Sequence, residues 1–135
     1  MPQPTPPLRD VVVPTVARKV LVVEDDGLVA NLMVEALARA GHRLELRSNA
    51  VEALRAVLHG EFEPDVVIAD VDLADASGIE LARMIESAVP GAAIVLVSSH
   101  DPDGLPLREM LGRGYRFLPK PFGVRRLQEE LLALG

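Results

Sequence analysis

The chain has 135 residues, which is the length of one domain and enough to bury a core of its own. It has no cysteine, which excludes disulfides and thiolate metal sites, and its net charge of -6 at pH 7 argues against a nucleic-acid-binding protein. No apolar run approaches a membrane span, and the first residues lack the pattern of a signal peptide. We therefore expect a cytoplasmic location and no membrane partner.

Residues 1–17 contain five of the eleven prolines of the chain. Proline lacks a backbone N–H and fixes one backbone angle, so this segment cannot sustain a helix. We predict a flexible or extended tail here, and a folded domain over residues 18–135.

The folded domain is predicted to alternate strands and helices. Continuous apolar runs indicate buried strands, and apolar residues at a period of 3.6 indicate helices with one buried face. The alternation of polar and apolar residues over 42–47 favours an edge strand with one solvent-exposed face. In chain order, the predicted strands are 19–23, 42–47, 66–70, 93–97 and 116–118, and the predicted helices are 29–40, 50–60, 78–89, 103–112 and 124–134.

Local signals mark several ends of these elements. Asn49 and Ser77 are each followed three residues later by glutamate, which is the spacing of a capping box at a helix start. Glycine and proline fall in the first turns of the helix predicted over 103–112, so we expect this helix to be the most mobile regular element. His42 and His59 lack partners at metal-ligand spacing and are interpreted as surface residues.

Strands that alternate with helices predict a parallel sheet with right-handed crossovers and helices on both faces. The carboxyl ends of parallel strands meet at one edge of such a sheet, where open α/β folds place their ligands. Asp70 ends the central strand, although an aspartate taken alone is more often a helix cap or a turn residue. Reactive or charged side chains also follow three other strands, namely Glu24, Asp25, Ser98 and Lys120. This convergence predicts a site at the carboxyl edge.

The clustered carboxylates predict an oxygen-rich site for a hard divalent cation such as Mg²⁺. Consecutive acids near a protein surface repel by about 4 kcal/mol per pair at ~4 Å, and either solvation or a bound cation would relieve this. With a lysine as a point charge and a serine hydroxyl, the site suits a phosphoryl group that an aspartate attacks. No glycine-rich phosphate loop is present, which argues against nucleotide binding.

Separated motifs occur in a fixed order: an acidic pair after the strand at 19–23, then Asp70, Gly78, Ser98-Ser99, Phe117 and Lys120-Pro121. With these motifs, residues 19–134 resemble a receiver (CheY-like) domain of two-component response regulators, of the single-domain type. The resemblance implies a flavodoxin-like, doubly wound sheet with strand order 2-1-3-4-5, and Mg²⁺ as the cofactor. The catalytic residues that it implies are Asp70, which is the phospho-accepting aspartate, Lys120 and Ser98. The implied metal ligands are Glu24, Asp25, Asp70 and the backbone carbonyl of Asp72. The resemblance also implies that the switch residues are Ser98 and Phe117 and that the Lys120-Pro121 peptide is cis.

The chain departs from the family pattern at three places. Many members have proline four residues after the phospho-accepting aspartate, where this chain has Ala74, and this change is expected to loosen the loop. Asp72 and His100 occupy positions that tune autodephosphorylation in the family, and a carboxylate at 72 would either repel phosphoryl oxygens or position water. Asp26 extends the acidic pair to three residues and could replace Asp25 as a metal ligand.

The resemblance also implies a mechanism and partners. A sensor histidine kinase or a histidine phosphotransfer protein gives its phosphoryl group to Asp70, and Phe117 then moves inward as Ser98 shifts. The altered surface binds a downstream protein target or passes phosphate onward. We therefore expect a protein that catalyses only its own phosphorylation and autodephosphorylation, with no output domain after Gly135. The last helices are a candidate surface for a homodimer.

Two other interpretations compete with this one. Asp70 and Asp72 superficially resemble the nucleophile motif of haloacid-dehalogenase-like phosphatases, but Ala74 stands where that motif has Thr or Val. The second alternative is a pseudo-receiver, which is a binding module of the same fold that is not phosphorylated. The retained acids, Ser98 and Lys120 argue against it, because a scaffold has no use for such a cluster.

Overall fold

The structure of the chain is a computed structural model that describes residues 17–99 and 105–134. The predicted tail, apart from residue 17, lies outside the described residues, as do His100 and the first two residues of the helix predicted over 103–112. The strands are β1 (Lys19–Val23), β2 (Arg43–Arg47), β3 (Val66–Asp70), β4 (Ala93–Ser98) and β5 (Arg116–Pro119). The helices are α2 (Gly27–Arg39), α3 (Ala50–Leu58), α4 (Gly78–Ala88), α5 (Leu105–Gly112) and α6 (Val124–Leu132).

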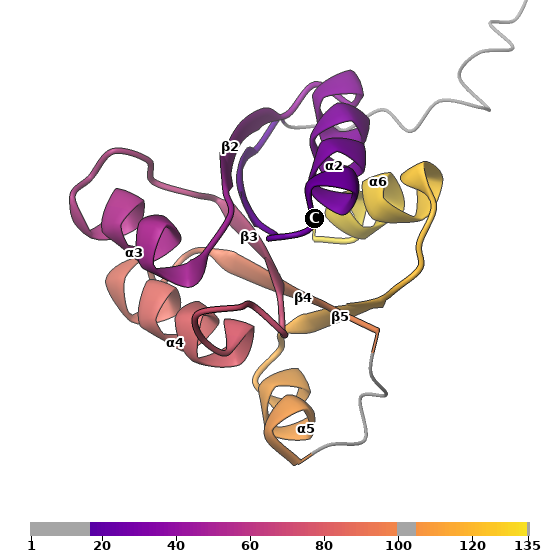
Figure 1. Cartoon of the computed structure of the whole chain (residues 1–135). Helices are drawn as coiled ribbons and strands as arrows, with labels where there is room; N and C mark the ends of the chain where they lie inside the picture. The colour runs from indigo at the N-terminus through magenta and orange to yellow at the C-terminus, as the bar shows by residue number, and fades with distance from the viewer. Residues whose placement is uncertain (1–16, 100–104, 135) are drawn as a thin grey trace, which may run out of the picture.

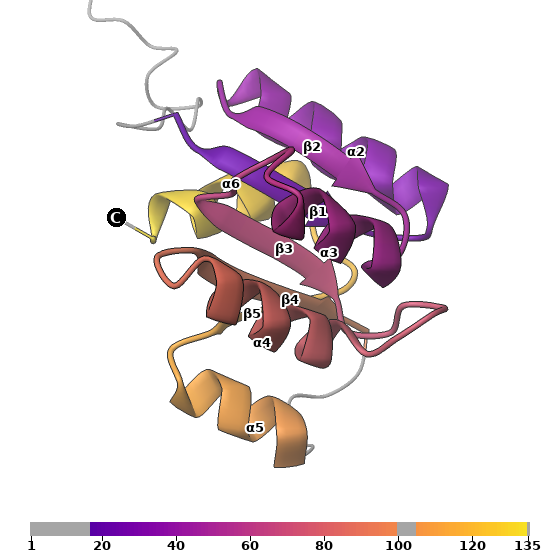
Figure 2. The ribbon, with the colours of Figure 1, turned by 90° about the vertical axis from the view of Figure 1, so that its left-hand side faces the viewer.

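The strands form one parallel sheet in the order β2-β1-β3-β4-β5, which confirms the predicted doubly wound fold (Figure 1). The strand with alternating polar and apolar residues, β2, lies at an edge of the sheet as predicted. Helices cover both faces, with α3 and α4 in front of the sheet and α6 behind it in Figure 2. None of the helices in the two described ranges has the length and hydropathy that crossing a bilayer requires.

The central strands are buried on both faces because their side chains alternate between two hydrophobic cores. In β1, Leu21 packs into the core beneath α3, α4 and α5, whereas Val22 packs into the core beneath α2 and α6. In β3, Val67 and Ile68 divide between the same two cores. Since the middle of each central strand is enclosed, polar chemistry is confined to the strand ends and the loops that follow them.

The helix starts are capped by side chains. Asn49 accepts a hydrogen bond from the N–H of Glu52, and Ser77 accepts one from the N–H of Ile79, so both residues cap their helices as predicted. The bond to Ser77 comes from the second helical residue and not from Glu80, as a capping box would have it. A third cap, Asp26, begins α2.

His42 is buried, so its interpretation as a surface residue is wrong, whereas His59 is exposed. The Nδ1 atom of His42 accepts a hydrogen bond of 3.0 Å from the backbone N–H of Arg18, 24 residues away, just before β1. Burial and the nearby Arg18 charge lower the pKa of His42. The partner is a backbone group distant in sequence, which explains why no local pattern signals this contact.

Candidate functional site

The polar residues that follow the strands meet at the carboxyl edge of the sheet, as predicted. They are Glu24 and Asp25 after β1, Asp70 at the end of β3, Ser98 at the end of β4, and Lys120 after β5. The strand register aligns Asp70 with Val97 and Ser98 with Pro119, so the neighbouring strands end almost level. The carboxyl edge of the sheet therefore carries polar side chains that follow or end four strands, namely β1, β3, β4 and β5.

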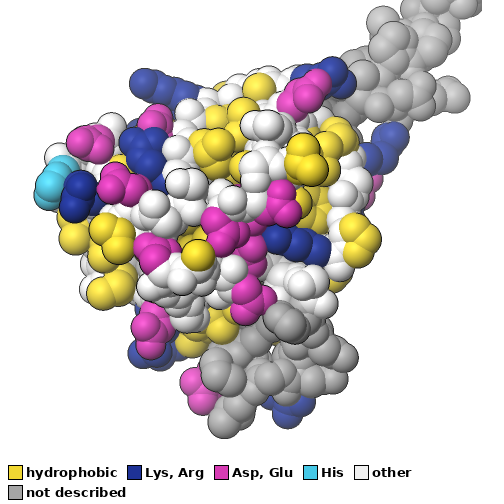
Figure 3. Space-filling view, viewed as in Figure 1, with side chains coloured by type: hydrophobic (Ala, Val, Ile, Leu, Met, Phe, Trp, Pro, Cys, Tyr) yellow, Lys and Arg dark blue, Asp and Glu magenta, His cyan; other side chains and the backbone are white. Residues whose placement is uncertain are grey.

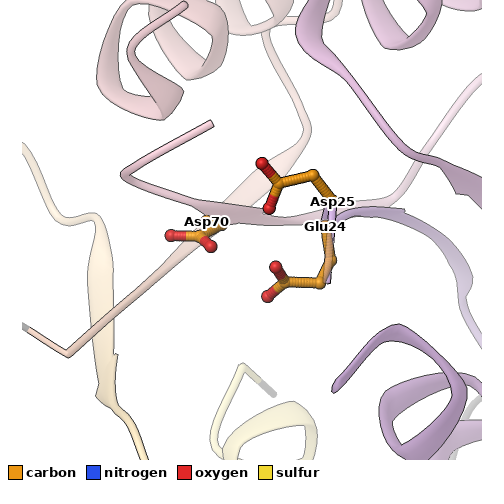
Figure 4. Close-up of side chains that lie close together, drawn as sticks. All are labelled: Glu24, Asp25 and Asp70. Atoms are coloured by element: carbon orange, nitrogen blue, oxygen red, sulfur yellow. The ribbon is translucent and has the colours of Figure 1, made fainter. Parts of the chain in front are cut away.

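Three of these side chains are carboxylates that share one small space. An oxygen from each of Glu24, Asp25 and Asp70 lies within 4.8 Å of the other two, and the three groups surround a common space in Figure 4. Glu24 and Asp70 are buried, while Asp25 is exposed. At this separation, each pair of charges repels by on the order of 3 kcal/mol at an effective dielectric constant of about 20. The cluster is therefore stable only with positive charge nearby.

Lys120 supplies positive charge to this cluster. Its Nζ atom lies 2.9 Å from Oε1 of Glu24 and 2.9 Å from Oδ2 of Asp70. Burial lowers the pKa of Lys120, but the two carboxylates outweigh burial and raise it above its usual value, so the ammonium stays charged. The peptide bond between Lys120 and Pro121 is cis, as the resemblance implies. One lysine against three carboxylates leaves a formal charge of two negative units in the cluster.

The donor set of the cluster fits a hard divalent cation, which takes carboxylate oxygens as ligands. Burial raises the pKa of Glu24, and the Lys120 ammonium and the Asp26 backbone N–H oppose this only in part. The Oε1 atom of Glu24 is buried, and the partner that the described residues offer it is the Lys120 ammonium at 2.9 Å, which also pairs with Asp70. A buried carboxylate whose cationic partner is shared with a second carboxylate is incompletely compensated, and a cation ligated there would complete the compensation.

Asp26 faces away from the cluster. Its side chain accepts hydrogen bonds from the N–H groups of Leu28 (3.0 Å) and Val29 (3.3 Å), and so caps α2. Asp25 instead turns toward the loop that follows β3, where its Oδ2 accepts a hydrogen bond of 3.1 Å from the N–H of Ala74. Of the two acids that the sequence left as alternatives, the structure groups Asp25 with the other carboxylates.

The remaining predicted residues lie around Asp70. The backbone N–H of Asp72 donates a hydrogen bond of 2.9 Å to Oδ1 of Asp70, but the exposed Asp72 side chain is not in the carboxylate cluster. Ser98 is buried, and its backbone oxygen accepts a hydrogen bond of 2.8 Å from the N–H of Lys120. Phe117 is half-buried against the core beneath α3, α4 and α5.

Gly78, the first residue of α4, is required by close packing under the site. A Cβ atom at this position would lie 1.9 Å from the backbone oxygen of Asp70, so any other residue would displace the end of β3. The N–H of Gly78 also donates a hydrogen bond of 2.9 Å to the backbone oxygen of Val71. This glycine lets α4 begin directly beside Asp70.

Asp75, in the loop between β3 and α4, contacts a second helix, which its sequence neighbours do not indicate. Its two carboxylate oxygens accept hydrogen bonds from the N–H groups of Ala50 (2.9 Å) and Val51 (3.0 Å) at the start of α3. These backbone hydrogen bonds lower the pKa of Asp75. Its partners are backbone groups 24 and 25 residues away, so the only sequence signal is an acid in a turn.

Comparison with known proteins agrees with this geometry. The family described as response regulator receiver domain matches residues 20–132. The DNA-binding transcriptional regulator NtrC of Bradyrhizobium sp. (strain RP501 Parasponia) is 32% identical over 111 residues, which cover 82% of this chain and 23% of that protein. Response regulator MprA of Mycobacterium sp. (strain KMS) is 28% identical over 116 residues, covering 86% of this chain and 50% of that protein. The chain thus spans from under a quarter to half of the length of these curated relatives.

Solved structures show the same fold. Chemotaxis response regulator CheY4 of Vibrio cholerae superposes with a TM-score of 0.77 at 23% identity, over 89% of this chain and 100% of that one. A CheY-like receiver domain protein from Methanospirillum hungatei JF-1 gives a TM-score of 0.78 at 24% identity, over 88% and 94% of the two chains. With the family match over most of its length, the chain belongs to the response regulator receiver domain family of two-component systems.

Proposed function

We propose that this chain accepts a phosphoryl group on Asp70 as the receiver of a two-component phosphorelay. The observation that carries the proposal is the placement of Asp70, which is buried at the sheet edge, ion-paired with Lys120 and clustered with two more acids. A scaffold gains nothing from an excess of buried negative charge, whereas a site for a cation and a phosphoryl group depends on it. The role is signalling in the cytoplasm, without turnover of a small-molecule substrate.

The proposed reaction is transfer from a phosphohistidine of a partner protein. A carboxylate oxygen of Asp70 attacks phosphorus and forms a P–O bond, while the P–N bond breaks and its electron pair goes to the imidazole nitrogen. Two contacts orient the nucleophile, since the N–H of Asp72 holds Oδ1 and the ammonium of Lys120 holds Oδ2. Lys120 can then follow the negative charge onto the phosphoryl oxygens.

The proposed ligands of Mg²⁺ are the carboxylates of Glu24, Asp25 and Asp70 and the backbone carbonyl of Asp72. When bound, Mg²⁺ neutralises charge on the phosphoryl group as it is transferred. The buried carboxylate of Glu24, which shares its ammonium partner with Asp70, and the cap formed by Asp26 support this choice of acids.

Ser98 and Phe117 are the proposed switch residues. Ser98 ends β4, the strand that pairs with β3, and its backbone oxygen accepts a hydrogen bond from the N–H of Lys120. It therefore lies close to the position that a phosphoryl group on Asp70 would occupy. Phe117 pairs with Leu96 on the neighbouring strand and is only half-buried, which leaves it a more buried position to adopt. Phosphorylation would shift the population between the two positions and alter the surface that a downstream protein binds.

A histidine kinase or a histidine phosphotransfer protein is the proposed phosphoryl donor. A groove of about 320 Å³ beside Lys120 has a mainly apolar lining of Val29, Leu32, Pro121 and Phe122. Leu28 nearby on α2 is 84% exposed, and Figure 3 shows hydrophobic side chains over α2 and α6 next to acidic ones. An apolar surface beside acids suits a helix of a protein, whereas the phosphates of a nucleic acid would be repelled.

Intact mass measurement tests the proposal. The chain is incubated with acetyl phosphate or phosphoramidate, with and without Mg²⁺, as wild type, Asp70→Asn and Asp26→Asn. The last variant is the matched control, because asparagine caps helices as well as aspartate does. We expect a gain of one phosphoryl group that requires Mg²⁺ in wild type and Asp26→Asn, and none in Asp70→Asn. A folded wild type that gains no mass, even from an added histidine kinase, would instead indicate a pseudo-receiver.

A further inference from the structure

The loop between β3 and α4 is tied to two separate parts of the molecule by consecutive residues. Ala74, expected to loosen this loop, donates its N–H to Oδ2 of Asp25 at 3.1 Å, a hydrogen bond that a proline could not form. The next residue, Asp75, binds the N–H groups of Ala50 and Val51 at 2.9 and 3.0 Å. The loop therefore bridges the carboxylate cluster and the start of α3.

Asp75 completes the capping of α3. The first N–H groups of a helix have no partner within the helix, and here they belong to Ala50, Val51 and Glu52. The local cap, Asn49, accepts a hydrogen bond of 2.8 Å from the N–H of Glu52. Asp75 supplies acceptors for the other two, and the helix dipole favours its negative charge at this position. The tether is therefore a bidentate, charge-assisted one.

We propose that Asp75 is a positioning residue of the metal site. By fixing the loop on the start of α3, it holds the N–H of Ala74 against Asp25, and so orients that carboxylate toward the other acids of the cluster. This inference rests on the proposed function, in which Asp25 is a ligand of Mg²⁺. Residues that orient metal ligands without touching the metal change metal affinity by about 10- to 100-fold.

The test compares Asp75→Ala with Asn49→Ala in the full chain. Both variants remove a capping acceptor from the same end of α3, but only Asp75→Ala releases the loop. Mg²⁺ binding is measured by isothermal titration calorimetry without a phosphoryl donor. We expect Asp75→Ala to bind Mg²⁺ about tenfold more weakly, at the lower end of the range for such residues, and Asn49→Ala to bind it like wild type. Both should unfold at lower temperatures, because each loses a helix cap.

Amide hydrogen exchange in the absence of metal tests separately whether Asp75 holds the N–H of Ala74 against Asp25. The N–H of Ala74 should exchange faster in Asp75→Ala than in wild type, and at the wild-type rate in Asn49→Ala. Equal Mg²⁺ affinity in wild type and Asp75→Ala, or unchanged exchange at Ala74, would overturn this inference and leave the proposed function standing. A wild-type chain that binds no Mg²⁺ would overturn both.

Discussion

Two glutamates, Glu24 and Glu130, are each 2% exposed but have opposite charge surroundings. Glu130 on α6 has two guanidinium partners, with Nε of Arg116 at 3.0 Å and Nη1 of Arg126 at 2.9 Å. Glu24 lies beside two further carboxylates, and Lys120 is shared between it and one of them. Glu130 therefore has two cationic partners for one carboxylate, whereas the cluster around Glu24 has one cation for three carboxylates.

The pKa directions follow this charge balance. Burial raises the pKa of both carboxyls, but two arginines outweigh it at Glu130 and hold that pKa below its usual value. At Glu24, Lys120 does not outweigh burial, and the pKa stays above its usual value. Burial of an acid therefore does not identify a functional site by itself. A deficit of positive charge around the acid is the feature that prepares it for a cation.

The largest effect should follow removal of both partners of Glu130. Arg116→Ala with Arg126→Ala leaves a buried carboxylate without the ion pairs that hold it, and such a loss costs about 3–5 kcal/mol. Because the arginine side chains are 39% and 50% exposed and partly screened, we expect the low end of this range, measured by urea unfolding. Adding Glu130→Met should restore most of the stability. A triple variant as unstable as the double one would show that arginine packing, and not the buried charge, is responsible.

The second largest effect should be stabilisation by Mg²⁺, which would supply the positive charge that the surroundings of Glu24 lack. At 100 times its Kd, a bound ligand adds about 2.7 kcal/mol to the free energy of unfolding. Thermal unfolding in MgCl₂ is compared with unfolding in NaCl of the same ionic strength, so that screening is separated from binding. Asp70→Asn should lose the Mg²⁺-specific stabilisation and Glu130→Gln should keep it. Equal stabilisation by both salts would contradict a metal site.

Acidification should remove the contribution of Glu130 to stability. At pH 7, Glu130→Gln loses charge-assisted hydrogen bonds, at a cost of about 2 kcal/mol. Since the fold lowers the pKa of Glu130 from 4.5, the unfolded chain takes up this proton first as the pH falls. The contribution is complete above pH 4.5 and is lost as the pH falls through the folded-state pKa. Urea midpoints of wild type and Glu130→Gln should therefore converge in acid, and a constant difference would exclude the charge as its source.

The fold and the place of the site were predictable because their signals are local. Uninterrupted apolar runs indicate strands covered on both faces, and the side chains of Val67 and Ile68 do enter opposite cores. Acids that directly follow strands must meet once the strands are parallel, which is how Glu24, Asp25 and Asp70 come together.

The contacts that sequence reasoning missed depend on partners distant in the chain. Asp75 and His42 bind backbone N–H groups, and a backbone group has no sequence signature. The two consecutive aspartates after β1, Asp25 and Asp26, have the same chemistry, and only the direction of the chain at the start of α2 makes Asp26 a cap. Glu130 resembles any charged residue of a helix until β5 brings Arg116 against it.

The smallest expected effect is a gain in the free energy of unfolding, in contrast to the losses expected above. It comes from Glu24→Gln, which should raise stability and lower Mg²⁺ affinity. Glu24→Gln keeps the side-chain shape, retains an oxygen that can accept from Lys120, and removes one of three clustered charges. Because the raised pKa of Glu24 means that its charge opposes folding, the metal-free variant should gain about 1 kcal/mol while its Mg²⁺ affinity falls. Urea unfolding in EDTA measures the gain, with Glu63→Gln as a control that removes the same charge from an exposed position. A loss of stability in Glu24→Gln, like that expected for Glu130→Gln, would show that Glu24 is held as a structural ion pair and that the contrast between the two glutamates is wrong.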